Sequence, residues 1–532
     1  LMNLCFKILR SGFKRLREIP ACLFFSRILN SSKMIFETLA DSSTPSAGPW
    51  WILFISIAWV VFSIAKFKMH PFLAMMIGAV LVGLLSGPLP EPTVENKGLF
   101  HSRVDLEETS SGPSDLTLAV KWSLYGFGNT AGGIALVIAL ASIVGTCMMK
   151  SGAAERVVRH LLSVFGEKRA GIVLLLSGFI LSIPVFFDTV FFLLIPLARA
   201  MSFRAGARYL YFVMAMAGAG AITHSMVPPT PGPLAIAEIL SIDIGVALPV
   251  GLLASIPLAL IVLWVSGWLD QKYKVPMRPV AGVGKEDLQS VLDKDLKDLP
   301  PLVQSYLPVL LPVFLISAVS LVKVLDFPER IQGGELFQIL SFLGEPNIAM
   351  SLAALVSIFL LVNQWKSQEL SDGPKVGKVL EAPLMTAGSI ILITGAGGAY
   401  GGMIRLSGVG ECIADFATTF EISYILLAWG ITALIRIAQG SATVAMMTGA
   451  GLMASIIGDG STLSYHPCYL FLAIGFGSIT LSWMNDSGFW VVQKLSGLNE
   501  KEMLKTWSLL LTVISVCGLM ISLLGSVLIP LR

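Results

Sequence analysis

The sequence has few charged residues. Asp, Glu, Lys and Arg make up 13% of its 532 residues, whereas 55% are hydrophobic; soluble domains carry about 25% charged residues. The short alternating segments of a membrane β-barrel are also missing. Instead, apolar stretches long enough to cross a bilayer recur from Trp50 to Leu531. These features predict an all-α polytopic membrane protein.

Motifs of nucleotide-driven and hydrolytic proteins are missing as well. The sequence has no Walker motif, no Ser-His-Asp nucleophile elbow and no His-Glu-x-x-His pair. Its six cysteines show no metal-ligand spacing. The glycine-rich string Gly395–Gly402 follows no predicted strand, so we interpret it as a helix–helix contact. We therefore expect no enzyme activity, no cofactor, no metal and no nucleic-acid partner.

Matching strings occur in two halves of the chain, about 257 residues apart. Thr130-Ala131-Gly132-Gly133-Ile134 recurs as Thr386-Ala387-Gly388-Ser389-Ile390, and Gly218–Ser225 recurs as Gly475–Ser482. A spacing that holds over about a hundred residues indicates two copies of one unit. Matching breaks within apolar segments are typical of the midplane binding site of a secondary transporter.

The distribution of lysine and arginine orients the chain, because basic loops stay in the cytoplasm. The span near 131–149 then runs inward and its repeat, 384–404, runs outward, which predicts inverted repeats. We assign 50–268 to the first transmembrane repeat and 269–303 to a cytoplasmic loop. Residues 304–532 hold linking spans, near 304–324 and 338–363, and the second repeat.

Residues 1–49 form an N-terminal leader in this scheme. The topology derived above requires the N-terminus to lie outside the cytoplasm. Residues 1–33 are basic, which conflicts with this, whereas the leader from Met34 onward is acidic and polar. We expect translation to start at Met34, so that residues 1–33 do not belong to the mature protein. The alternative is that they form a basic amphipathic targeting segment.

Two apolar segments are interrupted by polar or helix-breaking residues. Segment 170–197 contains Pro184 and Asp188, and each of its arms, about 21 Å long as a helix, is too short for a hydrocarbon core of about 30 Å. It predicts a re-entrant hairpin that enters from the cytoplasm. Segment 422–457 contains Gly440 and Ser441 and predicts a second hairpin that opens outside.

Titratable residues at the first break and at two further interruptions, Thr223–Pro233 and Asn485–Gly488, are candidates for proton coupling. An ionisable group inside a membrane segment costs at least about 2.5–3.5 kcal/mol, so it normally faces a cavity and serves function. A low-dielectric environment also disfavours a charged carboxylate, which makes Asp188 a plausible proton carrier. We assign proton coupling to Asp188, His224 and Asp486. The alternatives are helix-capping carboxylates and a hydrogen-bonded buried histidine.

Residues that could hold a substrate lie at the second break, at the two further interruptions and at Asn129 and Thr130. Arg436 could pair with a carboxylate, and small or hydroxyl-bearing neighbours allow close approach and donate hydrogen bonds. The alternatives are an Arg436 neutralised by a neighbouring acid, and packing or capping roles for the rest. The candidate substrate-binding residues are Asn129, Thr130, Thr223, Arg436, Gln439, Ser441, Thr443, Asn485 and Ser487.

Six strings of the sequence resemble the gluconate permease family, also called gluconate:proton symporters. They are Gly126–Thr130, Ser151–Arg156, Pro228–Pro233, Ile393–Gly398, Arg436–Ala445 and Asn485–Trp490. The resemblance covers about 52–528 and implies an inner-membrane carrier in the ion-transporter fold class that uses paired hairpins.

The sequence departs from that family at three positions. The family usually has glutamate where Asp188 stands, and histidine where Thr230 and Trp483 stand. The first change keeps the charge, whereas the other two remove titratable groups and change the shape of the pocket. The expected substrate is therefore a small organic anion of the sugar-acid type rather than gluconate specifically.

The leading interpretation is a multi-pass inner-membrane symporter. It would import gluconate or a related sugar acid or small hydroxycarboxylate together with protons. The alternative is a sodium-coupled organic-anion symporter, because carbonyls and hydroxyls at broken helices can also ligate sodium. The sequence leaves open the exact substrate, the coupling ion and whether the chain forms a homo-oligomer.

Overall fold

The chain is all-helical wherever the computed structural model describes it. The described residues are 48–87, 89, 116–184, 186–205, 208–278, 299–324, 334–367, 376–409, 412, 423–458, 460 and 463–531. No strand occurs among them, and seven of their helices are long and apolar enough to cross a membrane. Ile52–Arg532 forms one compact unit, distinct from Leu1–Trp51. Most of the predicted leader, residues 1–47, lies outside the described residues.

The first half contains two apolar helices, a long helix, a hairpin and a broken segment. Its elements are α3 (Gly48–Ala65), α4 (Pro71–Leu85), α5 (Leu116–Lys150), α6 (Ala153–Phe165), η3 (Glu167–Arg169), α7 (Ala170–Leu181), α8 (Phe187–Ala205), α9 (Tyr209–Met226), α10 (Pro231–Ile239) and α11 (Ile244–Tyr273). The predicted span near 131–149 is only the second half of the 35-residue helix α5. Most of the predicted loop after α11, residues 279–298, lies outside the described residues.

The second half repeats this order. Its elements are α13 (Leu302–Val324), α15 (Glu335–Leu343), α16 (Pro346–Ser367), α17 (Val376–Leu406), α19 (Tyr424–Gln439), α20 (Ala442–Ile457), α21 (Cys468–Gly477), α22 (Ser487–Ser496), α23 (Glu500–Lys505) and α24 (Trp507–Leu528). The predicted linking span near 338–363 begins too early, because its first residues belong to α15 and the membrane span itself is α16. Gly344 caps α15, and Pro346 begins α16 at a position that needs no backbone N–H donor.

Helices of the two halves pack on each other in equivalent pairs. Helix α4 of the first half packs on α17 of the second, and α16 of the second half packs on α5 of the first. In the same way α10 packs on α20, and α22 packs on α8. Within each half, α7 packs on α9 as α19 packs on α21. Two copies of one unit produce this pattern of equivalent helix pairs when an approximate two-fold axis relates them.

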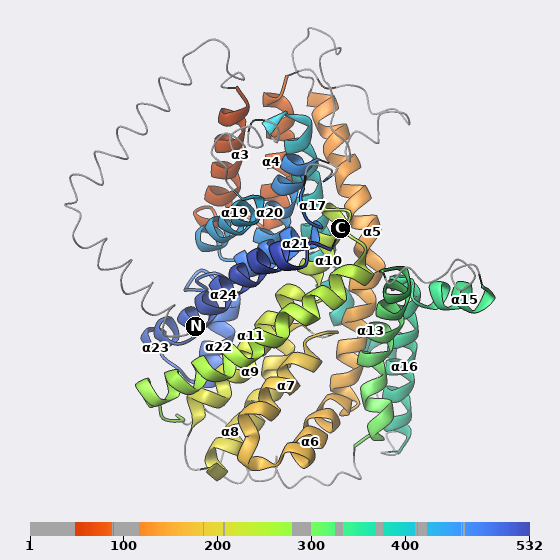
Figure 1. Cartoon of the computed structure of the whole chain (residues 1–532), viewed down its shortest axis with the longest axis vertical. Helices are drawn as coiled ribbons and strands as arrows, with labels where there is room; N and C mark the ends of the chain where they lie inside the picture. The colour runs from red at the N-terminus through yellow and green to blue at the C-terminus, as the bar shows by residue number, and fades with distance from the viewer. Residues whose placement is uncertain are drawn as a thin grey trace, which may run out of the picture. The chain divides into compact units, whose positions relative to one another are not determined.

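The central helices α5 and α17 run in opposite directions. Thr130, in the first half of α5, lies against Gly398, in the second half of α17. At the other end, Lys150 of α5 and Lys378 of α17 line one cavity. Figure 1 shows the hairpin α7–α8 in the lower part of the unit and the hairpin α19–α20 in the upper part. The predicted fold, inverted repeats with broken helical hairpins, is confirmed.

The residues at each break explain why the helices stop there. Ser182 caps α7, and Pro184 lies in the turn before α8 begins. Gly440 caps α19 with a φ of 92°, a left-handed conformation that favours glycine. Ser441 then caps α20, and its Oγ accepts from the Val444 N–H at 3.3 Å. The two breaks therefore place the N-termini of α8 and α20 at hairpin tips.

Candidate functional site

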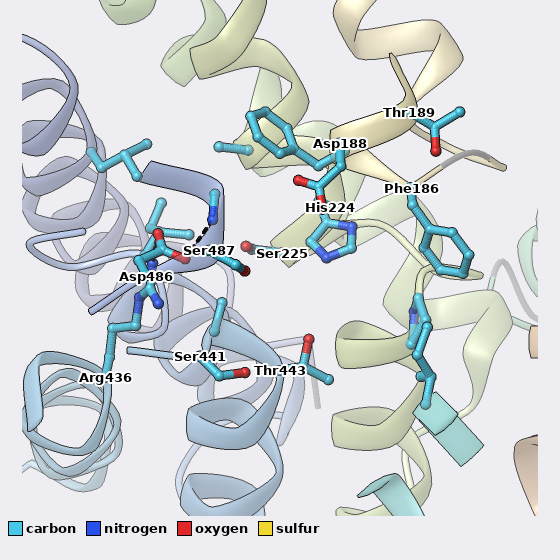
Figure 2. Close-up of a pocket in the computed structure, with 18 of the residues that line it drawn as sticks. Phe186, Asp188, Thr189, His224, Ser225, Arg436, Ser441, Thr443, Asp486 and Ser487 are labelled. Atoms are coloured by element: carbon cyan, nitrogen blue, oxygen red, sulfur yellow. Dashed lines mark hydrogen bonds and ion pairs between the residues drawn. The ribbon is translucent and has the colours of Figure 1, made fainter. Parts of the chain in front are cut away.

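A cavity of about 320 Å³ lies where the two hairpin tips meet (Figure 2). It is lined by residues of both halves: Phe186, Phe187, Asp188, Thr189, Ala221, His224, Ser225, Pro231, Thr386, Ile390, Arg436, Ser441, Ala442, Thr443, Ile479, Asp486, Ser487, Gly488, Trp507 and Leu511. Five helices, α8, α10, α20, α22 and α24, contribute their first residues to this lining. Helix N-termini carry partial positive charge and unsatisfied N–H groups, so this geometry favours an anionic ligand.

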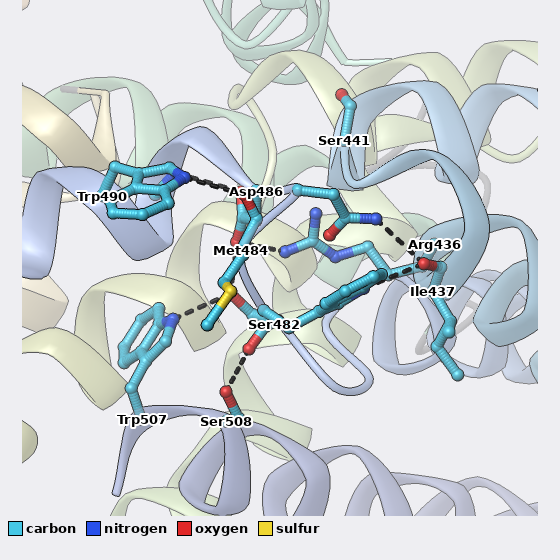
Figure 3. A network of polar contacts seen from close by, with 12 residues as sticks. Arg436, Ile437, Ser441, Ser482, Met484, Asp486, Trp490, Trp507 and Ser508 are labelled. Atoms are coloured by element: carbon cyan, nitrogen blue, oxygen red, sulfur yellow. Dashed lines mark hydrogen bonds and ion pairs between the residues drawn. The ribbon is translucent and has the colours of Figure 1, made fainter. Parts of the chain in front are cut away.

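An ion pair lies at one side of the cavity (Figure 3). Arg436, only 3% exposed, donates from Nη2 to Oδ2 of Asp486 at 2.5 Å. Asp486 is the N-cap of α22, and its Oδ1 accepts from the Gly488 N–H at 3.0 Å. Ser482 donates its hydroxyl to Oδ2, and Trp507 Nε1 donates to the Ser482 hydroxyl at 2.8 Å. The carboxylate of Asp486 is thus held in place from several directions.

Arg436 keeps donors that this pair does not use. Its Nε and Nη1 are buried and have no hydrogen-bond partner among the described residues, and the same holds for Nδ1 of His224. Leaving a buried donor unpaired costs about 1–3 kcal/mol, and more when the group is charged. The site therefore favours a ligand that brings acceptor atoms, as a carboxylate does.

Seven predicted site residues line the cavity. They are Asp188, His224, Arg436, Ser441, Thr443, Asp486 and Ser487. Asp188 and Ser441, from the two hairpin tips, therefore lie at one cavity, as the inverted-hairpin model predicts. Asp188 is exposed in the cavity rather than buried, and it makes no hydrogen bond or ion pair with the described residues.

Two predicted residues instead hold the second hairpin tip in shape. The Gln439 side chain donates to the Ser441 carbonyl at 2.5 Å and accepts from the Ser441 N–H at 3.0 Å. Asn485 donates to the Ile437 carbonyl at 2.9 Å and so ties the segment before α22 to the end of α19. Neither side chain lines the cavity. Their contacts fix the backbone beside Arg436.

Three further predicted residues lie outside the lining. Thr130 packs against Gly398 in the contact between α5 and α17. Thr223 donates its hydroxyl to the carbonyls of Phe179 and Ala219, which joins α9 to α7. Asn129 is exposed on α5. The structure does not bring these three together with the residues of the cavity.

Sequence reasoning missed two notable lining residues. Thr386 is the repeat partner of Thr130, so the duplication was a signal that could have found it. Trp507 begins α24 and stacks on Phe187 with 5.8 Å between ring centroids. No motif surrounds Trp507, and only the fold brings it to the first hairpin. Of the three departures from the gluconate permease pattern, Thr230 and Trp483 lie outside the lining, and Asp188 lies within it.

Comparison with known proteins gives consistent matches over most of the chain. The model of the GntP family permease matches residues 115–528. A gluconate permease of Pseudomonas aeruginosa is 34% identical over 474 residues, covering 89% of this chain and 96% of that protein. A Gnt-II system L-idonate transporter of Escherichia coli is 29% identical, covering 89% of this chain and 98% of that protein.

A solved structure shares the fold. The YdaH transporter of Alcanivorax borkumensis, described as having an unusual topology, superposes with a TM-score of 0.59 and 15% identity. The match covers 87% of this chain and 100% of that chain. At 15% identity this likeness shows a shared fold alone. The family model and the two relatives, in contrast, match this chain in sequence. The chain belongs to the GntP permease family.

Proposed function

We propose that this multi-pass protein of the inner membrane imports gluconate or a related sugar acid or small hydroxycarboxylate together with protons. The observation that carries the proposal is Arg436, whose two unpartnered buried donors lie at a cavity formed by helix N-termini. Relatives named as a gluconate permease and an L-idonate transporter support a sugar acid as the substrate.

The charges that line the cavity support proton coupling. Among the described lining residues, Asp188 and Asp486 are acidic and Arg436 is basic, which gives a formal charge of about −1 with His224 neutral. A bound carboxylate would increase the negative charge of the cavity further. In a partly desolvated site this costs a large amount of free energy. Protonation of Asp188 relieves this repulsion, because Asp486 is already paired with Arg436. The substrate and a proton then enter as a neutral pair.

Transport by the purified protein tests the proposal. Proteoliposomes are offered a panel of labelled sugar acids with an inward proton gradient and no sodium, or with a sodium gradient at equal pH on both sides. We expect saturable uptake of at least one sugar acid with protons alone, and its loss when an uncoupler is added. Accumulation that requires sodium would replace proton coupling by the sodium alternative. No saturable uptake of any sugar acid would refute the proposal.

A further inference from the structure

A second, larger cavity adjoins the first. It measures about 890 Å³ and is lined by Ala141, Ser142, Gly145, Thr146, Lys150, Pro184, Phe186, Thr189, Lys378, Val379, Ala382, Pro383 and Thr386. Phe186, Thr189 and Thr386 line both cavities. In Figure 2, Phe186 and Thr189 lie on the opposite side of the first cavity from Arg436 and Asp486. We call these two adjacent cavities, which share part of their lining, the path; it begins at the hairpin tips.

The far part of this path is positively charged. Lys150 is the last residue of α5, and Lys378 lies in the first turn of α17. Both side chains are exposed, and the described residues that line this cavity include no Asp or Glu. The lining also supplies hydroxyl groups, from Ser142 and Thr146 among others. A cleft lined by charge of one sign concentrates ions of the opposite sign by about 10-fold to 1,000-fold.

The orientation of α5 and α17 indicates on which side of the membrane Lys150 and Lys378 lie. Because α5 and α17 are antiparallel, the C-terminus of α5 and the N-terminus of α17 lie at the same end of the pair. The segment that follows Lys150, formed by α6 and η3, holds Arg156, Arg159 and Lys168. Basic loops are retained in the cytoplasm. The second cavity accordingly lies at the cytoplasmic end of this helix pair.

We propose that the second cavity is the cytoplasmic part of the transport path, and that Lys150 and Lys378 form a low-affinity site there for a carboxylate-bearing solute. This inference rests on the proposed function for the identity of the solute. Phe186, at the tip of the first hairpin, divides the lysine site from the cavity that holds Arg436. A solute leaving Arg436 passes Phe186 and meets a second positive charge before it reaches the cytoplasm.

Thiol labelling tests the charge of the path without any sugar acid. Thr146 lines the second cavity one helical turn before Lys150, so Thr146→Cys places a thiol beside both lysines. The reaction rates with an anionic and a cationic methanethiosulfonate are compared in purified protein, and labelling of the native cysteines is subtracted. We expect Lys150→Gln with Lys378→Gln to lower the ratio of anionic to cationic rates by about tenfold.

Two controls make this comparison specific. Lys168→Gln removes an exposed lysine outside the cavity lining and should leave the ratio at Thr146→Cys unchanged. Ser163→Cys, an exposed site on α6, should show no change of ratio when Lys150 and Lys378 are replaced. A ratio at Thr146→Cys that does not depend on the two lysines would overturn the proposal, whatever the protein transports.

A transport measurement then tests the role of the lysines. In exchange assays, the double lysine variant should raise the half-saturation concentration of a transported sugar acid at the cytoplasmic face severalfold, and leave the outer value unchanged. Equal effects at both faces, or none, would refute a cytoplasmic site. If the unaltered protein transports no sugar acid, the proposed function fails, whereas the labelling result still decides whether the path is positively charged.

Discussion

Arg436 and Asp486 form a buried ion pair, with 2.5 Å between Nη2 and Oδ2, at the wall of the cavity between the hairpin tips. Arg436 lies in the last turn of α19, and Asp486 caps the N-terminus of α22. The pair joins the second hairpin to the broken segment that follows α21. It also neutralises one acid of the cavity and leaves Arg436 with unused donors.

This pairing determines how Arg436 should be tested. Arg436→Gln alone would leave Asp486 buried without its partner, which costs about 3–5 kcal/mol and can prevent folding. The double variant Arg436→Gln with Asp486→Asn removes both charges and keeps both side-chain shapes. Because each lost hydrogen bond to a charged group costs about 1.5–3 kcal/mol, we expect a tenfold or larger rise in the half-saturation concentration.

The control for this pair is Asp486→Asn alone, which leaves Arg436 charged and buried without its partner. This also costs about 3–5 kcal/mol, so the control must be shown to fold. It should bind the substrate at least as tightly as the unaltered protein, because Arg436 gains a further free donor. Thermal unfolding in detergent should show that both variants are folded. A folded double variant with normal substrate affinity would mean that backbone N–H groups at the helix N-termini hold the carboxylate.

Asp188→Asn should separate substrate binding from accumulation. The change keeps the shape of the side chain and removes the group that we expect to carry the proton. Uptake against a gradient should collapse, whereas exchange of preloaded substrate, which needs no net movement of protons, should be much less affected. Asp243→Asn is the matched control, because Asp243 caps α11 outside the cavity and asparagine is an equally good cap. Normal proton-driven uptake by Asp188→Asn would move the coupling role to Asp486 or His224.

Gly440→Ala should destabilise the second hairpin. At a φ of 92°, an alanine costs about 1–2 kcal/mol, and its Cβ would also collide with the backbone carbonyl of Asn485. We expect a clear fall in melting temperature. Gly388→Ala in α17 is the control, since its Cβ meets no atom and alanine favours a helix. Equal melting temperatures for the two variants would contradict the required close approach at Gly440.

The hairpins were predictable because their breaks leave local marks in the sequence. Pro184, Gly440 and Ser441 interrupt apolar runs with residues that end or cap helices, and each break appears where it was expected. The inversion followed from the charge of the flanking loops. The break between α15 and α16 also leaves a local mark, Gly344-Glu345-Pro346-Asn347, yet the predicted span near 338–363 runs across it.

Long-range contacts could not be predicted in the same way. The sequence marked Arg436 and Asp486 as separate candidates, but their pairing depends on how α19 meets the segment before α22. Thr130 and Thr386 occupy equivalent repeat positions, yet Thr130 packs against Gly398 and Thr386 lines both cavities. The protein departs from two-fold symmetry between these residues, and a repeat in the sequence carries no signal of that departure.

Substrate protection of a thiol in the first cavity tests the central claim most directly. Thr443 lines this cavity in the first turn of α20, so Thr443→Cys places a thiol beside the expected carboxylate. A transported sugar acid should slow alkylation of this thiol with a half-effective concentration that matches its half-saturation in transport, and should not affect Ser163→Cys on α6. Unchanged alkylation of Thr443→Cys at a saturating concentration of that sugar acid would contradict the account.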